Sequence, residues 1–265
     1  MRRAGVSDFV PIEQARALPG PKLVATPGIP NPWTEAAKGI LHVKGIDHIR
    51  VAQMAGEAND ALVAWTGINS APILIHEGTP PKAGWVEILL LAERLAPEPR
   101  LIPADEAERA TMFGLAHALC SEDGFGWNRR LLFFADAEAA IAKLGATTDR
   151  SGFDRMSDKY GHGGDAAHAR ARLSSILHML SRHLLARRAA GELYYLRDRL
   201  TALDIYSATF MAMVRPLPLE LCPIDLALHA SYTATDPAIL DAADDILFEH
   251  RDFVYRRYLE LPMRL

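Results

Sequence analysis

The first hundred residues alternate short apolar runs with amphipathic stretches. Residues 22–26 form an apolar run that stops at a Pro-Gly pair, which predicts a buried strand entering a turn. From Pro32 to Lys44 the apolar side chains recur at spacings of three and four, with proline at the start and glycine just past the end, as in an amphipathic helix. The other elements predicted here are strands over 46–52 and 73–75, the latter entered through proline, and a helix over 85–95. This alternation predicts a small α/β domain.

A proline-rich segment separates this region from the rest of the chain. Residues 96–104 contain three prolines, so we predict a linker between domains there. Asp105 and Glu108 then form a capping-box pattern, and further helices are predicted over 136–144, 165–187 and 190–214, with no strand-like alternation between them. The predicted class is α+β: an α/β domain over 1–95, with 1–21 as an N-terminal extension, followed by an all-α domain over 105–265.

Composition and charge narrow the function classes. The 265 residues are 49% hydrophobic and 23% charged, an ordinary globular composition that can build real cores. The formal net charge of −4 supplies no broad basic field, so we expect no nucleic-acid partner. The two cysteines, Cys120 and Cys222, are too few for a disulfide framework and suit a reducing cytoplasm. No run of about 18 apolar residues occurs, so no membrane span is expected.

Four local motifs at matching intervals carry a family resemblance. They are Pro32–Gly45, Ser70–Leu74, Leu95–Ala110 and the capping box Thr201–Ile205. Together they resemble the cytosolic glutathione transferases, in a divergent bacterial-type form. The resemblance implies a thioredoxin-like N-terminal domain, an all-helical C-terminal domain and a cis bond before Pro72. It also implies glutathione as co-substrate, a small apolar electrophile as second substrate and a homodimer.

The chemistry of that family requires a stabilised thiolate, because the thiolate and not the thiol is the nucleophile. Asn31 stands where the family has serine or cysteine; its amide can donate to sulfur but cannot form a mixed disulfide. We predict Asn31 and Thr34 as catalytic residues, assisted by the N–H groups and the dipole at the start of the helix, with Thr26 as a further hydroxyl. A simple turn role for Asn31 is an equal alternative.

The predicted glutathione contacts follow from the resemblance. The residue before the cis proline, Ala71, pairs in the family through its backbone with the cysteinyl part of glutathione. The family's Glu-Ser pair falls on Gly84 and Trp85, which do not match it, and Glu87 stands two or three positions late. The alternatives are a packing role for Trp33 and a helix-start role for the exposed carboxylate of Glu87. The full predicted set is Trp33, Asn69, Ala71, Pro72, Trp85 and Glu87.

A pocket for the electrophile is predicted within residues 120–130. Its candidate residues are Cys120, Phe125, Trp127 and Arg130, and either Arg129 or Arg130 could bind a carboxylate. The alternative is that Gly124 and Gly126 mark a loop whose aromatic side chains merely pack. His117 and Cys120 lack the partners of a metal set, so no metal is predicted. Trp85 and Leu89–Leu91 are a candidate dimer contact.

Two functions remain open on this basis. The leading hypothesis is an enzyme that adds the glutathione thiolate to an apolar electrophile through non-standard catalytic residues. The alternative is a non-catalytic protein of the same fold that binds another ligand or a protein partner, motivated by the missing Glu-Ser pair.

Overall fold

A mixed four-stranded sheet forms the centre of the N-terminal part. The computed structural model describes residues 8–144, 151–160, 165–196 and 198–265. The strands are β1 (Phe9–Val10), β2 (Lys22–Ala25), β3 (Ile49–Ala52) and β4 (Ile73–Ile75), in the order β1-β3-β2-β4. β1 and β2 run parallel to β3, and β4 runs antiparallel to β2. The two central strands are thus β3 and β2. The predicted strands over 22–26 and 73–75 are confirmed, and the strand predicted over 46–52 begins only at Ile49.

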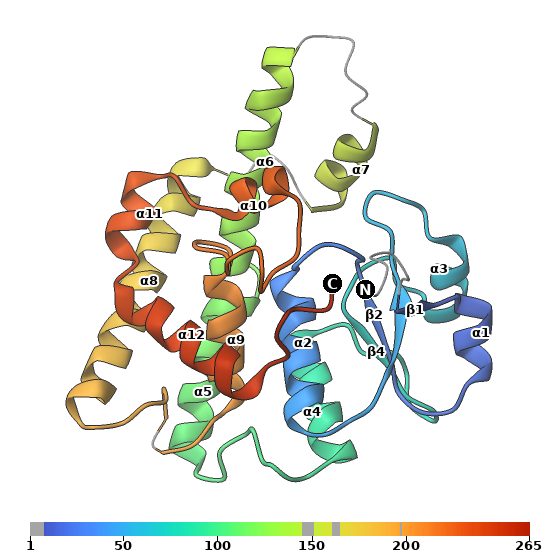
Figure 1. The fold of residues 1–265 in the computed structure, drawn as a ribbon, viewed down its shortest axis with the longest axis horizontal. Coiled ribbons are helices and arrows are strands. Elements are labelled where there is room, and N and C mark those ends of the chain that lie inside the picture. The colour runs from blue at the N-terminus through green and yellow to red at the C-terminus, as the bar shows by residue number, and fades with distance from the viewer. Residues whose placement is uncertain (1–7, 145–150, 161–164, 197) are drawn as a thin grey trace.

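Helices cover both faces of this sheet (Figure 1). The helices α1 (Ile12–Ala17) and α3 (Asp60–Thr66) lie on one face, and α2 (Pro32–Val43) and α4 (Trp85–Leu95) lie on the other. Successive strand residues point to opposite faces, so Leu23 joins the core on the side of α2 and α4, whereas Val24 joins the core on the side of α1 and α3. The sheet is therefore buried on both sides.

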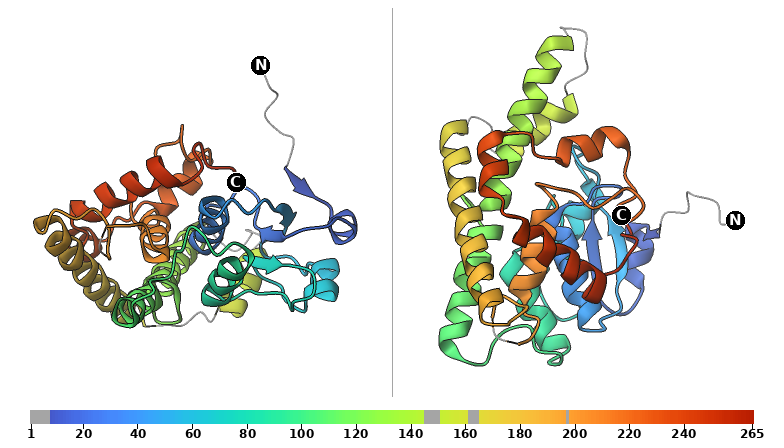
Figure 2. Two further views of the ribbon diagram at one scale, coloured as in Figure 1. Left: turned by 90° about the horizontal axis from the view of Figure 1, so that it is seen from below. Right: turned by 60° about the vertical axis from the view of Figure 1, so that its left-hand side comes forward.

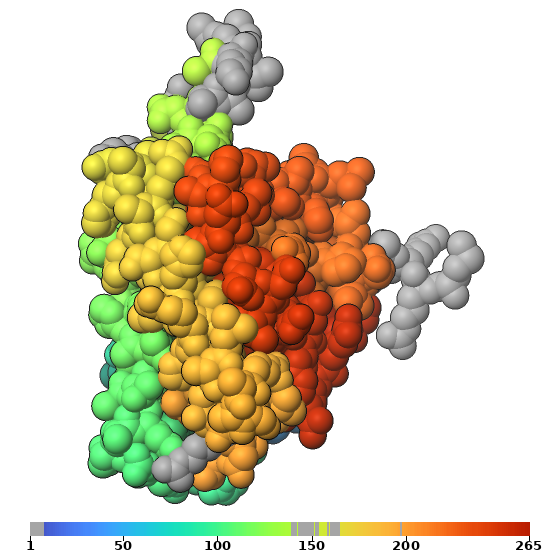
Figure 3. Space-filling model, turned by 90° about the vertical axis from the view of Figure 1, so that its left-hand side faces the viewer, coloured from blue at the N-terminus to red at the C-terminus, as the bar shows by residue number. Residues whose placement is uncertain are grey.

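The C-terminal part is a bundle of helices around α9. Its members are α5 (Glu106–Cys120), α6 (Phe125–Leu144), α7 (Ser151–Tyr160), α8 (Ala166–Ala189), α9 (Ala202–Met211), α10 (Leu226–Tyr232), α11 (Pro237–Ala242) and α12 (Asp245–Tyr258). Every residue of α9 is buried, and this helix packs against α2, α5 and α12. On the outer surface, α8 lies beside α6, α11 and α12 (Figure 3). The predicted fold class, a thioredoxin-like part followed by a helical part, is confirmed.

The buried capping box holds the start of α9. Asp204 accepts hydrogen bonds through Oδ2 from the backbone N–H and the hydroxyl of Thr201, at 2.8 Å each, and through Oδ1 from the N–H of Tyr195 at 3.0 Å. A buried carboxylate needs several such donors to offset its lost hydration. The predicted folding role of this box follows from these contacts.

The far end of α6 projects beyond the other helices, and α7 returns from it towards α3 (Figures 1 and 2). Arg155 of α7 donates to the backbone carbonyl of Gly56, and Lys159 donates to that of Asn69. Both carbonyls belong to the N-terminal part. α7 therefore connects the two parts on the side opposite to the linker.

Two local predictions are wrong. The helix predicted over 190–214 begins only at Ala202, because Gly191 adopts a left-handed backbone (φ +78°) just past the end of α8 and the chain then turns. The loop predicted around Gly124 and Gly126 is the start of α6. These glycines allow close packing: a Cβ at Gly124 would lie 2.7 Å from the Ser121 carbonyl oxygen, and one at Gly126 would lie 2.4 Å from Phe210.

The described part of the predicted N-terminal extension contributes an edge strand and a helix to the α/β part. Residues 9–10 pair with β3 and residues 12–17 form α1, whose Ala15 is buried in the core beside Val51.

At the other edge of the sheet, Leu74 and Lys82 exchange backbone hydrogen bonds of 2.7 and 2.9 Å without forming a further strand. Residues 96–105 contain neither helix nor strand. Among the helices that the structure describes, none has the length and apolar character of a membrane span.

Candidate functional site

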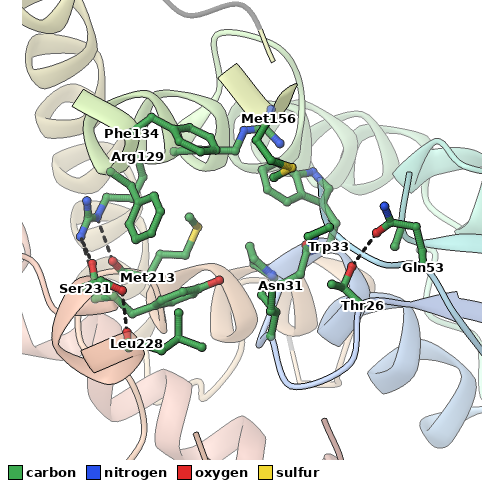
Figure 4. Close-up of a pocket in the computed structure, with 17 residues that line it drawn as sticks. Thr26, Asn31, Trp33, Gln53, Arg129, Phe134, Met156, Met213, Leu228 and Ser231 are labelled. Atoms are coloured by element: carbon green, nitrogen blue, oxygen red, sulfur yellow. Dashed lines mark hydrogen bonds between the residues drawn. The ribbon is translucent and has the colours of Figure 1, made fainter. Parts of the chain in front are cut away.

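A cavity lies between the two parts of the chain (Figure 4). It encloses about 170 Å³, and most of its surface is apolar. In Figure 4, Thr26 and Gln53 lie at one end, Arg129 and Ser231 lie at the other, and Asn31 and Trp33 lie between them. The N-terminal part further contributes Ile29, Pro32, Ala55 and Ala71, and the helical part contributes Arg130, Phe133, Phe134, Met156, Met213, Leu228 and Tyr232. An apolar cleft with a few polar groups is the usual form of a small-molecule site.

Asn31 is the N-cap of α2. Its Oδ1 accepts from the backbone N–H of Trp33 at 3.0 Å and from that of Thr34 at 3.4 Å. The expectation that these two N–H groups are free to bind sulfur is therefore wrong, since the cap already uses them. The side-chain Nδ2 has no hydrogen-bond partner among the residues that the structure describes, while Asn31 lines the cavity. The oxygen of the Asn31 amide thus accepts hydrogen bonds from the helix, while its two N–H groups can donate to a ligand in the cavity.

Thr26 follows β2 and faces the same cavity. Its hydroxyl donates to Gln53 Oε1 at 2.9 Å, and both side chains are buried. Gln53 is in turn held by donating to the carbonyl oxygen of Met54 at 3.0 Å. Because the hydroxyl proton is committed to Gln53, Thr26 presents oxygen lone pairs to the cavity and serves there as an acceptor.

Trp33 both packs in the core and lines the cavity. Its indole N–H donates to the carbonyl oxygen of Cys120 at 2.8 Å, and its ring meets Phe210 edge to face at 5.0 Å. The guanidinium of Arg130 lies 5.2 Å from the Trp33 ring and 4.5 Å from the Trp127 ring, within the range of cation–π attraction. These contacts fix one wall of the cavity.

Of the other predicted pocket residues, Arg130 lines the cavity. Trp127 is not part of the lining and contacts the Arg130 guanidinium with its ring, and Phe125 is fully buried in the core. Cys120 is also buried, and burial raises the pKa of its thiol well above the usual range. Such a thiol stays protonated and unreactive at neutral pH.

The predicted glutathione contacts fall into two groups. Ala71 lines the cavity, and its bond to Pro72 is cis, as the resemblance implies. Asn69 does not line it and instead holds a loop, accepting from Asn59 at 2.9 Å and donating to the carbonyl oxygen of Glu57 at 3.0 Å.

The helix α4 directs its predicted residues away from the cavity. Trp85 donates from its indole N–H to the hydroxyl of Ser121 at 3.0 Å and packs against Tyr206. Glu87 accepts from the backbone N–H of Gly84 at 3.2 Å, which is a helix-capping contact. Leu89 and Leu91, predicted as a dimer contact, are buried within the chain's own core.

Thr34 also lies outside the cavity lining. Its hydroxyl oxygen is buried and has no hydrogen-bond partner within the described ranges. It is the side chain one position further into α2 than Trp33, and helical geometry turns it towards the packed interior.

Arg129 is the main cavity residue that the sequence reasoning weighed but did not select. Its side chain is buried, with Nε donating to the carbonyl of Met213 at 2.9 Å and Nη2 to those of Ser231 and Tyr232 at 3.5 and 3.4 Å. Burial lowers the pKa of this guanidinium. The helical spacing along α6 could have indicated a shared cavity-facing side, which is formed by Arg129, Arg130, Phe133 and Phe134. Three other lining residues reach the cavity only through the tertiary fold: Met156, Met213 and Tyr232. Within the described residues no cluster of three or more metal-ligand side chains occurs.

Comparisons with known proteins agree on the fold. No known family model and no curated protein matches the sequence. A glutathione transferase family member from Pseudomonas fluorescens, solved with two glutathione bound, superposes with a TM-score of 0.62 at 13% identity, over 93% of this chain and 94% of that one. The beta-etherase LigF from Sphingobium gives 0.56 at 17% identity, over 87% and 99%. Glutathione transferase Omega 3C from Trametes versicolor gives 0.50 at 15%, over 88% and 93%. The chain has the glutathione transferase fold.

Proposed function

We propose that the protein is a glutathione transferase-like enzyme that binds glutathione and adds its thiolate to an apolar electrophile. The observation that carries this proposal is the amide of Asn31, whose oxygen caps α2 while its NH₂ group is left for the cavity. A thiolate beside this amide would accept a hydrogen bond and would lie at the positive end of the helix dipole.

The surrounding residues suit the same reaction. Thr26 can accept the hydrogen bond of the entering S–H group, and Ala71 offers backbone groups for the cysteinyl part of the tripeptide. The thiol proton leaves to solvent before the electrophile is attacked. The sulfur then forms the new C–S bond while the π bond at the electrophilic carbon opens, and the neighbouring atom that receives this electron pair takes a proton from solvent. The apolar walls limit the water around the sulfur, which would weaken both electrostatic effects. A homodimer and a cytoplasmic location are parts of this proposal.

The decisive comparison is between Asn31→Asp and the unchanged protein. Aspartate is as good an N-cap as asparagine, so α2 should keep its start, but the NH₂ donor is lost and a negative charge faces the sulfur. We expect glutathione binding by titration calorimetry to weaken and the pKa of the bound thiol, followed by thiolate absorbance, to rise by about one unit or more.

Gln14→Glu makes the same amide-to-carboxylate change on the exposed side of α1, outside the cavity. It is the matched control and should leave both quantities unchanged. Absence of glutathione binding at millimolar concentration in the unchanged protein would reject the proposal. An unaltered thiol pKa in Asn31→Asp would reject the role of Asn31.

A second candidate is a non-catalytic protein of this fold that binds another ligand or a protein partner. Its support is the start of α4, where Glu87 caps its own helix and Gly84 and Trp85 do not offer the Glu-Ser pair. This candidate predicts a stable fold and no conjugation with any of a panel of electrophiles. A conjugation rate that Asn31→Asp removes would exclude it.

A further inference from the structure

The end of the cavity opposite to Thr26 holds a buried cation. Arg129 is only 5% exposed and lines the cavity. The carboxylates of Asp136 and Asp236 act on its guanidinium, but no described carboxylate lies within ion-pair distance of it. A buried charge is costly unless it is paired or hydrogen-bonded, and an arginine remains charged at any pH that proteins meet. The position therefore requires an explanation.

Part of that cost is offset by the helix ends. Met213 lies two residues past the end of α9, and Ser231 and Tyr232 end α10. The carbonyls that Arg129 binds therefore lie at the negative ends of two helix dipoles. These bonds use Nε and Nη2. The third nitrogen, Nη1, donates to none of the described residues.

The other polar groups near Arg129 are directed elsewhere. The hydroxyl of Ser231 donates to the carbonyl oxygen of Leu228 at 2.7 Å. Tyr232 meets Arg129 through its backbone carbonyl, whereas its phenol lies beside Glu35 and Cys222. Phe134 and Met213 line the cavity near Arg129 (Figure 4). An apolar chamber thus ends in the guanidinium of Arg129.

We infer that this end of the cavity binds the carboxylate of an otherwise apolar electrophile, with Arg129 Nη1 as the donor. A carboxylate is the anion whose planar oxygens match arginine donors. Because Arg129 and Asn31 occupy different regions of the cavity (Figure 4), such a substrate would present its apolar body and reactive carbon between the carboxylate and the thiol. The inference deepens the proposed function and rests on it for the reaction, although not for binding.

The test compares two ligands of nearly equal shape that differ in charge. Phenylpropanoate and phenylpropanamide are titrated separately into the protein by calorimetry, without glutathione. We expect the acid to bind at least about tenfold more tightly, since hydrogen bonds to charged groups are the strong ones. In Arg129→Met the acid should lose this advantage while the amide binds as before. Equal affinities of acid and amide for the unchanged protein would overturn the inference, as would a preserved acid preference in Arg129→Met.

Since Arg129 also holds the ends of α9 and α10, Arg129→Lys serves as a second variant that keeps the charge but not the planar fork. Its acid preference should fall between those of the unchanged protein and Arg129→Met, and a preference equal to that of the unchanged protein would contradict the geometry. Arg172 is half-buried, lies outside the cavity and pairs with Asp123. Arg172→Met is the matched control and should bind both ligands as the unchanged protein does.

Glutathione separates this inference from the proposed function. When the experiment is repeated with saturating glutathione, the acid preference should persist. Competition between glutathione and the acid would overturn the inference, because the carboxylate site would then belong to the tripeptide. Failure of glutathione to bind would reject the proposed function and leave the ligand comparison standing.

Discussion

Gly126 permits the closest packing between α6 and the wall of the cavity. A Cβ built at this position would lie 2.4 Å from Phe210 Cε1 and 2.8 Å from two atoms of the Trp33 ring. Neither ring has room to yield, because Trp33 is held by its hydrogen bond to Cys120 and Phe210 is fully buried. Gly126→Ala should therefore force a shift of α6 or of the indole.

The magnitude follows from two opposing effects. Alanine in a helix gains up to about 1 kcal/mol over glycine, whereas overpacking a core costs about 1–3 kcal/mol. Since both contacts are far below van der Waals distance, we expect the upper end of that cost and a net loss of about 2 kcal/mol in the free energy of unfolding. Gly114 is the matched control: it is exposed within α5, and a Cβ there meets nothing within 4 Å. Gly114→Ala should gain about 1 kcal/mol.

Urea unfolding followed by far-ultraviolet circular dichroism measures both variants against the unchanged protein. Tryptophan fluorescence of the folded states should differ for Gly126→Ala and not for Gly114→Ala, because only the former displaces Trp33. If Gly126→Ala is as stable as the unchanged protein while Gly114→Ala shows its gain, the packing argument is wrong.

Three further predictions concern other buried or paired groups. Thr34→Val replaces a buried hydroxyl that has no hydrogen-bond partner in the described part of the chain. The free energy of unfolding should stay the same or rise by up to about 1 kcal/mol, and the conjugation rate should not change. Loss of the conjugation rate would instead support the predicted catalytic role of Thr34. Asp204→Ala removes the buried acceptor of Thr201 and Tyr195 and should cost about 3–5 kcal/mol in urea unfolding, with Asp204→Asn in between; a cost below about 1 kcal/mol would contradict the buried-box argument. Asp236→Asn keeps the cap of α11 but loses the ion pair with Arg170, which lowers the pKa of Asp236. A carboxyl group whose pKa is lower in the folded than in the unfolded protein stabilises the fold at pH values above its unfolded pKa, and this stabilisation is lost as the pH falls. The free energy of unfolding should therefore differ between Asp236→Asn and the unchanged protein by about 0.5 kcal/mol at neutral pH, and the difference should disappear below pH 3.8. A difference that stays constant with pH would contradict this argument.

The sequence predicts the elements whose signals are local. The helix from Pro32 is found at its observed start because proline and Asn31 mark a helix start, and its end is found within one residue because Gly45 follows it. The cis bond before Pro72 also follows from the resemblance. Each of these depends on a few consecutive residues.

The walls of the cavity are formed by residues that lie far apart in the sequence, and no local sequence pattern predicts such contacts. The sequence predicts Gly126 as a loop residue. A glycine is needed there because the ring of Phe210, in a helix distant along the chain, packs against it, and only the fold shows this contact. Phe125 is selected as a pocket residue, yet it faces the core; once α6 is known to begin there, the positions that reach the cavity are Arg129 and Phe133, four and eight residues later. Tyr232 lies about a hundred residues further along the chain.

The largest hydrophobic cluster does not stop at the linker. Leu23 and Ile40 from the N-terminal part share it with Met112, Phe210 and Leu247 from the helical part. Neither part could be exchanged for that of a distant relative without also exchanging the helix faces that meet at this shared core. For recombination, in evolution or in engineering, the workable boundary is therefore a packing surface between α2, α5 and α9, and not the proline-rich stretch of sequence where the chain crosses over.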